Sequence, residues 1–113
     1  MKIINKPVSL VALQKMAKRK FGNMVKAVVD VDRGIMAVDG ELHADEEALL
    51  IERGSKQEHL WGINLYPELD TKQWIEFDSM INLRPSVGNM TRGVSDPKTR
   101  RRIIDVVNAL VRR

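Results

Sequence analysis

The spacing of apolar residues predicts one helix near each end of the chain. Over residues 9–21 they recur at helical intervals, with Ser9 placed as the N-cap and Gly22 following the last turn. Near the C-terminus, Asp96 is the expected N-cap of a second helix, and Pro97 suits its first position. The two apolar stripes are Leu10, Leu13, Ala17 and Phe21, and then Ile103, Ile104, Val107, Leu110 and Val111.

Between these helices the sequence changes to alternating and β-branched residues, which are typical of strands. Residues 24–31 and 35–38 predict a hairpin, because Asp32-Arg33-Gly34 between them is a turn sequence. Residues 60–66 and 74–83 predict two further strands.

Residues 41–54 fit two structures. The acidic residues 45–47, the apolar run after them and Gly54 suit a helix, whereas a strand over about 47–52 that turns at Gly54 fits as well. We favour the strand, because a hairpin to residues 60–66 needs little extra chain.

The order of these elements predicts an α+β fold, in which a mostly antiparallel sheet of about five strands is flanked by an N-terminal and a C-terminal helix. The length of 113 residues predicts a single domain over residues 1–113. No apolar run approaches the roughly 20 residues of a membrane helix, and the residues after Lys2 lack an apolar signal-peptide core. The chain has no cysteine for a disulfide or thiolate site. We expect a cytoplasmic protein with no membrane partner.

Charge divides the chain into a basic, an acidic and a second basic part. Residues 1–26 carry seven bases and no acid, residues 27–97 six bases and fourteen acids, and residues 98–113 six bases and one acid. The net charge of +4 therefore conceals a strong separation of charge. Basic ends suggest nucleic acid as a partner, and complementary parts also favour contacts between copies of the chain.

A candidate catalytic cluster is the run Asp39, Glu41, His43 and Asp45, in which every second residue is ionisable. If this stretch is extended, all four side chains point the same way, and a histidine among carboxylates suits proton transfer. The same residues also fit the solvent-exposed face of a strand and turn. Their spacing matches no metal-binding signature, so we expect neither a metal nor another cofactor.

A candidate anion-binding site consists of Arg84, Asn89 and Arg92, in a loop over residues 84–95 that leads to the helix at Asp96. Arginine side chains match phosphate or carboxylate groups, and helix N-termini present free amides. However, Asp96 would repel an anion at this helix end, and both arginines also fit as partners of acidic side chains. No glycine-rich phosphate-binding signature occurs.

Candidate nucleic-acid contacts are Arg100, Arg101 and Arg102. They could contact phosphates without sequence preference, or they could form a solvated helix face. No aromatic residue lies among them to stack on bases. Because bases are unfavourable in the first turn of a helix, we expect an external acid to hold them, either a phosphate or the acidic face of another copy.

Three stretches carry a family resemblance: GIMAVDGELHAD at residues 34–45, LWGINLYP at 60–67 and MINLRP at 80–85. They resemble a family of small prokaryotic proteins that is catalogued only as a domain of unknown function. The resemblance spans nearly the whole chain. It implies a stand-alone cytoplasmic protein, and it brings no activity, cofactor or catalytic residue.

Three hypotheses of function follow. We favour a small interaction or accessory protein that acts as a homo-oligomer, because the charged parts are complementary and no catalytic signature occurs. The second hypothesis is a nucleic-acid-binding module that uses the basic terminal helices. The third is a small enzyme in which the His43 cluster acts on an anionic substrate held by Arg84 or Arg92. Convergence of these side chains in one cleft would favour the enzyme.

Overall fold

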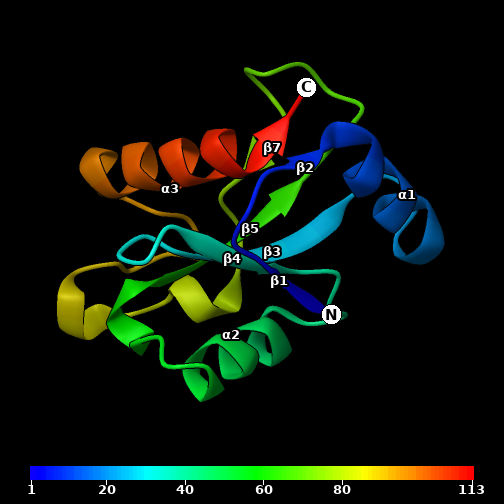
Figure 1. Ribbon diagram of the computed structural model, residues 1–113. Coiled ribbons are helices and arrows are strands. Elements are labelled where there is room, and N and C mark those ends of the chain that lie inside the picture. Colours follow the sequence, from blue (N-terminus) through cyan, green and yellow to red (C-terminus); the bar gives the residue numbers. More distant parts are fainter.

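The protein is a five-stranded sheet with helices on both faces, as the computed structural model of residues 1–113 shows (Figure 1). The sheet order is β1-β4-β3-β5-β6, and each neighbouring pair is antiparallel. The strands of the sheet are β1 (Lys2–Ile4), β3 (Val25–Asp30), β4 (Ile35–Val38), β5 (Leu60–Leu65) and β6 (Ile75–Glu76), and the helices are α1 (Leu10–Lys20), α2 (His43–Glu52) and α3 (Pro97–Leu110). The predicted α+β fold, with helices near both ends of the chain, is confirmed.

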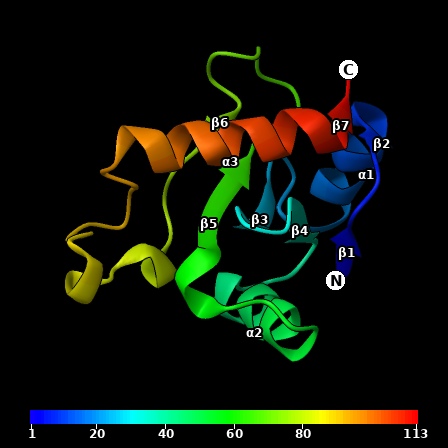
Figure 2. The ribbon, with the colours of Figure 1, turned by 60° about the vertical axis from the view of Figure 1, so that its left-hand side comes forward.

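The helices form two layers. Helices α1 and α3 lie over one face of the sheet, and α2 lies over the other (Figures 1 and 2). The short strands β2 (Val8–Ser9) and β7 (Val111–Arg112) pair in parallel and tie the start of α1 to the end of α3. Both expected caps are present: Ser9 Oγ accepts from Ala12 N–H at 3.2 Å, and Asp96 Oδ1 accepts from Lys98 N–H at 3.2 Å.

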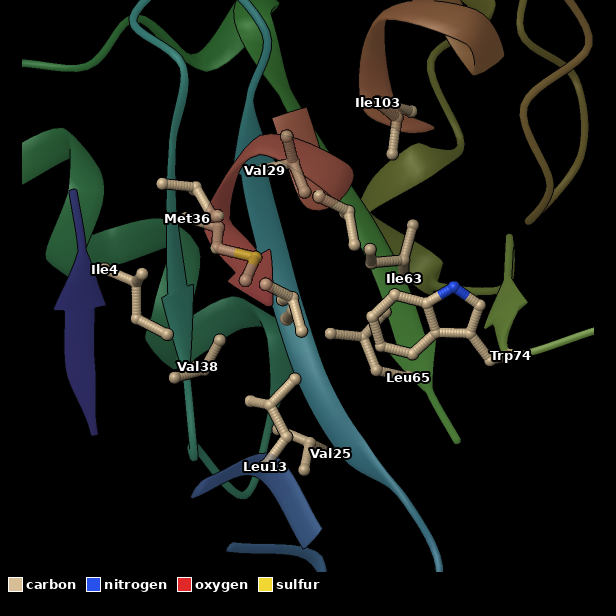
Figure 3. Packing of buried hydrophobic residues seen from close by; sticks show 14 of the residues in the cluster. Ile4, Leu13, Val25, Val29, Met36, Val38, Ile63, Leu65, Trp74 and Ile103 are labelled. Atoms are coloured by element: carbon tan, nitrogen blue, oxygen red, sulfur yellow. The ribbon is translucent and has the colours of Figure 1, made fainter. Parts of the chain in front are cut away.

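The larger hydrophobic core lies between the sheet and the α1–α3 layer. Successive strand residues point to opposite faces, so Val29 of β3 and Ile63 of β5 share this face (Figure 3). Leu13 from α1, Ile103 from α3 and Trp74 close over them, and all five side chains are almost completely buried. Burial of this kind, worth about 25 cal/mol per Å² of apolar surface, is the main force that holds the helices on the sheet.

The smaller core lies under α2, where Leu50 packs on Val28, Ala37 and Leu60. This helix shows that the favoured strand over residues 47–52 is wrong. In α2 only Leu50 of the apolar run is buried, and Ile51 is 44% exposed. The run therefore does not have the alternation of buried and exposed residues that a strand would need. Acidic side chains in the first turn of α2 also favour the helix through its dipole.

The predicted strand over residues 74–83 is correct only at its start. Ile75–Glu76 pairs with β5 as β6, and Met80–Asn82 forms a single 3-10 turn instead of continuing the strand. Two further 3-10 turns cover Gln57–His59 and Pro85–Val87. None of the three helices has the length and apolar character needed to cross a membrane.

Candidate functional site

A row of polar residues crosses the α2 face of the sheet next to the smaller core. Lys26 of β3 lies opposite Asn64 of β5, and Asn64 lies opposite Glu76 of β6. Asn64 Nδ2 donates to Glu76 Oε1 at 2.9 Å and to the Asp78 carbonyl at 3.3 Å. Tyr66 Oη–H also donates to Glu76 Oε1, at 3.0 Å. The sheet therefore presents an organised polar surface on the side of α2.

His43, the first residue of α2, is buried beside this row. Its Nε2 lies 2.8 Å from the carbonyl oxygen of Ile63. A carbonyl oxygen only accepts, so Nε2 carries the proton, and in the neutral ring Nδ1 keeps its lone pair. Burial lowers the pKa of His43 below its usual value, and the charges of Lys26 and Arg92 lower it further. The hydrogen bond to Ile63 and the charge of Asp78 raise the pKa, but they do not outweigh the burial. His43 is therefore a neutral imidazole at neutral pH.

The His43 hollow, as we call it, is a depression of about 190 Å³ whose polar lining is Lys26, His43, Ser79 and Arg92. The His43 ring makes its one hydrogen bond within the chain through Nε2. Arg92 Nε donates to Asp78 Oδ1 at 2.7 Å, which fixes the guanidinium and leaves its terminal nitrogens free. The hollow is thus lined by an imidazole that can accept a hydrogen bond and by two cationic side chains.

The segment that carries Ser79 and Arg92 is held on the sheet by Asn82. Asn82 Oδ1 accepts from Gly62 N–H at 2.8 Å, and its Nδ2 donates to the carbonyls of Gly62 and Arg92, each at 2.9 Å. Asn82 thereby pairs with the edge of β5 as a strand residue would, where β6 has ended. Gly62 is needed for this approach, since a Cβ there would lie 2.5 Å from Ser79 Cβ.

The loop over residues 84–95 is an ordered structure centred on Asn89. Asn89 Nδ2 donates to the carbonyls of Asn82, Thr91 and Gly93 at 2.6–3.2 Å. Its Oδ1 accepts from both Ser95 N–H and Ser95 Oγ–H. The side-chain amide of Asn89 therefore makes all its hydrogen bonds to the loop and to Asn82, and it helps to position Arg92. Asn89 does not line the His43 hollow.

Arg84 lies outside the His43 hollow. It donates to the Leu60 carbonyl, pairs with Glu47 at 3.7 Å and stacks on the Trp61 ring at 4.7 Å. Burial lowers the pKa of Arg84, and the charge of Glu47 opposes this. Of the three predicted anion-binding residues, only Arg92 converges with His43.

The predicted cluster of Asp39, Glu41, His43 and Asp45 does not form. These residues are not one extended strand, because Asp39 has a φ of 66° and α2 begins at His43. Asp39 pairs with Arg19 at 3.3 Å and with Lys20 at 3.9 Å, while Glu41 and Asp45 are exposed. The structure contains no group of three or more carboxylate and imidazole side chains that could hold a metal ion.

Glu46 is a buried acid that the sequence pattern does not predict. It lies on the sheet side of α2, three residues after His43, and is wholly buried. Its Oε2 accepts from Gly40 N–H at 2.9 Å, and its Oε1 has no partner. Burial raises the pKa of Glu46 to about 9, so that the side chain is a neutral acid at neutral pH.

The arginines of the first turn of α3 find partners within the chain. Arg100 donates to the carbonyls of Val94 and Ser95 at 2.6 and 3.3 Å, and Arg102 donates to the Val31 carbonyl at 3.4 Å. These carbonyls offset the unfavourable helix dipole, so no external acid is needed to explain Arg100 and Arg102. Arg101 is exposed and makes no such contact.

Fold and site together define a small α+β protein with an imidazole and two cations around a hollow on its sheet. The chain belongs to the family described as a protein of unknown function, DUF5674, whose model matches residues 2–110. The predicted membership in a family of unknown function is thereby confirmed. Neither the curated proteins nor the solved structures give a significant match.

Proposed function

We propose that the protein binds a small anion that carries a hydrogen-bond donor, in the His43 hollow. The observation that carries this proposal is the orientation of His43, whose Nε2–H is fixed on the Ile63 carbonyl at 2.8 Å. This bond leaves Nδ1 as the hydrogen-bond acceptor of the neutral ring. Lys26 and Arg92 line the same hollow and supply the positive charge that an anion requires.

The size of the hollow limits the ligand. Its volume of about 190 Å³ is below the roughly 300 Å³ at which clefts for drug-sized ligands begin. An inorganic oxyanion, or the phosphate or carboxylate end of a larger molecule, is the size that fits. A neutral imidazole held by a backbone carbonyl is also the arrangement of a general base, and in that role His43 Nδ1 would take a proton from the donor group of the ligand.

The test compares phosphate with sulfate, since phosphate carries a P–OH donor at neutral pH and sulfate is an acceptor only. Isothermal titration calorimetry of the whole chain is expected to show phosphate binding about tenfold or more tightly, the value of one good hydrogen bond to a charged group. His43→Gln keeps a donor for the Ile63 carbonyl and is expected to abolish the preference for phosphate. Arg92→Gln is expected to weaken the binding of both anions.

Arg101→Gln is the matched control, because it removes the same charge from the opposite layer of the molecule. Equal affinity for phosphate and sulfate, or equal losses in Arg92→Gln and Arg101→Gln, would contradict the proposal. The first result would mean that His43 does not accept a hydrogen bond from the anion. The second would mean that only the overall charge attracts the anion.

A second candidate function is self-association, and the charge of the two helix layers favours it. Helix α1 carries Lys15, Lys18, Arg19 and Lys20 and no acid, whereas α2 carries no lysine or arginine and exposes the acids Asp45 and Glu52. Because α1 and α3 lie on one face and α2 on the other (Figures 1 and 2), head-to-tail contacts between copies would bring opposite charges together.

Sedimentation at low and high salt tests this second candidate. Association at about 20 mM salt that disappears at about 500 mM, where charges are screened within a few ångströms, would support it. A monomer under both conditions would refute it. The basic layer is also the surface that a nucleic acid would contact, and retention of duplex DNA by a monomer would favour that partner instead. For both candidates we expect the cytoplasm as the location, which fractionation of cells would test.

A further inference from the structure

A second hollow lies at the outer edge of the sheet, beside β1 and the C-terminal end of α2. It has a volume of about 490 Å³. Its charged lining is Lys2, Arg33 and Arg53, with no acidic residue among the lining side chains. We call it the β1-edge hollow. It is separate from the His43 hollow, with which it shares no lining residue.

Arg33, an exposed residue at this hollow, is held in place by hydrogen bonds that lead to the buried pair Ser55 and Asp30. Its Nη1 donates to Ser55 Oγ at 3.1 Å and to the Arg53 carbonyl at 3.0 Å. Ser55 Oγ–H in turn donates to Oδ2 of Asp30 at 2.7 Å, and both Ser55 and Asp30 are buried. This network uses only Nη1, so Nη2 and Nε of Arg33 keep their donors for a ligand. An arginine held in this way binds an anion with little loss of side-chain entropy.

The other wall of the hollow is apolar. Ile3, Ile35 and Leu49 line it, and all three are only partly buried. They pack on the smaller core of Val28, Ala37, Leu50 and Leu60, which has four buried members against eighteen in the larger core. The smaller core therefore has an apolar side that the chain itself does not cover.

We propose that the β1-edge hollow binds an organic anion, with a short aliphatic body against Ile3, Ile35 and Leu49 and a phosphate or carboxylate head at Arg33, Arg53 and Lys2. Two independent features select this ligand class. The cations without an acidic neighbour select the negative head, and the half-covered apolar wall selects the aliphatic body. An inorganic anion would use only the first feature, and a neutral aliphatic only the second.

The test measures binding of octyl phosphate, inorganic phosphate and octyltrimethylammonium to the whole chain, at concentrations at which the amphiphiles are monomeric. Octyl phosphate is expected to bind about tenfold or more tightly than inorganic phosphate at this hollow, since eight carbon atoms bury apolar surface. The octylammonium probe is expected not to bind. Arg53→Gln and Lys2→Gln are the informative variants, because neither side chain makes a hydrogen bond or ion pair that holds the fold.

Each of these variants is expected to weaken the binding of octyl phosphate about tenfold, whereas Arg101→Gln, which removes a charge outside both hollows, is expected to leave it unchanged. Equal affinity for octyl phosphate and inorganic phosphate, or equal binding of the octylammonium cation, would overturn the proposal. A loss in His43→Gln with none in Arg53→Gln would also overturn it, since the ligand would then occupy the His43 hollow. Binding to phosphatidylglycerol vesicles without binding of monomeric octyl phosphate would overturn it in favour of a lipid surface.

Discussion

Asn82 bonds both backbone groups of Gly62 through its side-chain amide, at 2.8 and 2.9 Å, and so takes the place of a strand at the edge of β5. The same amide donates to the Arg92 carbonyl. One side chain thus completes the sheet and positions a cation of the His43 hollow. This relationship joins the stability of the fold to the geometry of the site.

Asn82→Asp tests that relationship with almost no change of shape. The new carboxylate can still accept from Gly62 N–H, but it faces the carbonyls of Gly62 and Arg92 with an acceptor where Asn82 has a donor. We expect a loss of about 2–3 kcal/mol in the free energy of unfolding at neutral pH, because two acceptors are left facing a buried charge. Urea unfolding measures it. A loss below about 0.5 kcal/mol, the usual range of surface substitutions, would contradict the bonding described.

Gly62→Ala tests the close approach of residues 79–82 to the sheet. The added Cβ would lie 2.5 Å from Ser79 Cβ, so the segment has to move away from β5. We expect a destabilisation of about 1–3 kcal/mol, typical of overpacking. Ser79→Gly removes the atoms in conflict, and the double variant is expected to recover part of the loss. Equal urea midpoints for the single and the double variant would argue against this contact as the cause.

Glu46→Gln is expected to change how stability depends on pH. The pKa of Glu46 is raised from 4.5 to about 9 in the folded protein, so between these values the folded state keeps a proton that the unfolded state releases. Stability from this site is fully present below pH 4.5 and is lost as the pH rises toward 9, by at most about 1.4 kcal/mol per pH unit. Glutamine is neutral at every pH and retains an acceptor for Gly40 N–H.

Urea unfolding of the wild type and of Glu46→Gln across this range provides the measurement. Near pH 5, where little of the loss has accrued, the two proteins are expected to be similarly stable, whereas near pH 8 the variant is expected to be more stable by about 1 kcal/mol or more. A difference that stays constant with pH would show that Glu46 does not titrate in the way its burial implies. The control is Glu41→Gln, which removes an exposed acid five residues earlier in the chain.

Sequence patterns were sufficient for the long amphipathic elements of the fold. Helices α1 and α3 carry both a periodic apolar stripe and a polar cap, at Ser9 and Asp96, and these local signals agree with the tertiary packing. Helix α2 has no side-chain cap and only a four-residue apolar run, so its type depended on contacts with the sheet. The end of β6 was equally hidden, because beyond it β5 pairs with the side-chain amide of Asn82 and not with a strand.

The candidate site was predicted only in part. His43 and Arg92 were both named from the sequence, yet the acidic neighbours expected around His43 lie elsewhere. Lys26 reaches the site through the pairing of β3 with β5 opposite Asn64, and that register depends on the order of strands in the sheet. No feature of the sequence indicated that Glu46 is buried, since an acidic residue at the start of a helix is expected to be exposed.

The most direct test of the account is the protonation state of His43, measured by nitrogen-detected NMR of its imidazole with and without phosphate. We predict a neutral ring with the proton on Nε2 at about pH 7, and a pKa below the usual 6.5. We further predict that phosphate moves the Nδ1 resonance and that sulfate leaves it in place. A charged ring at pH 7, a proton on Nδ1, or equal responses to the two anions would contradict the account.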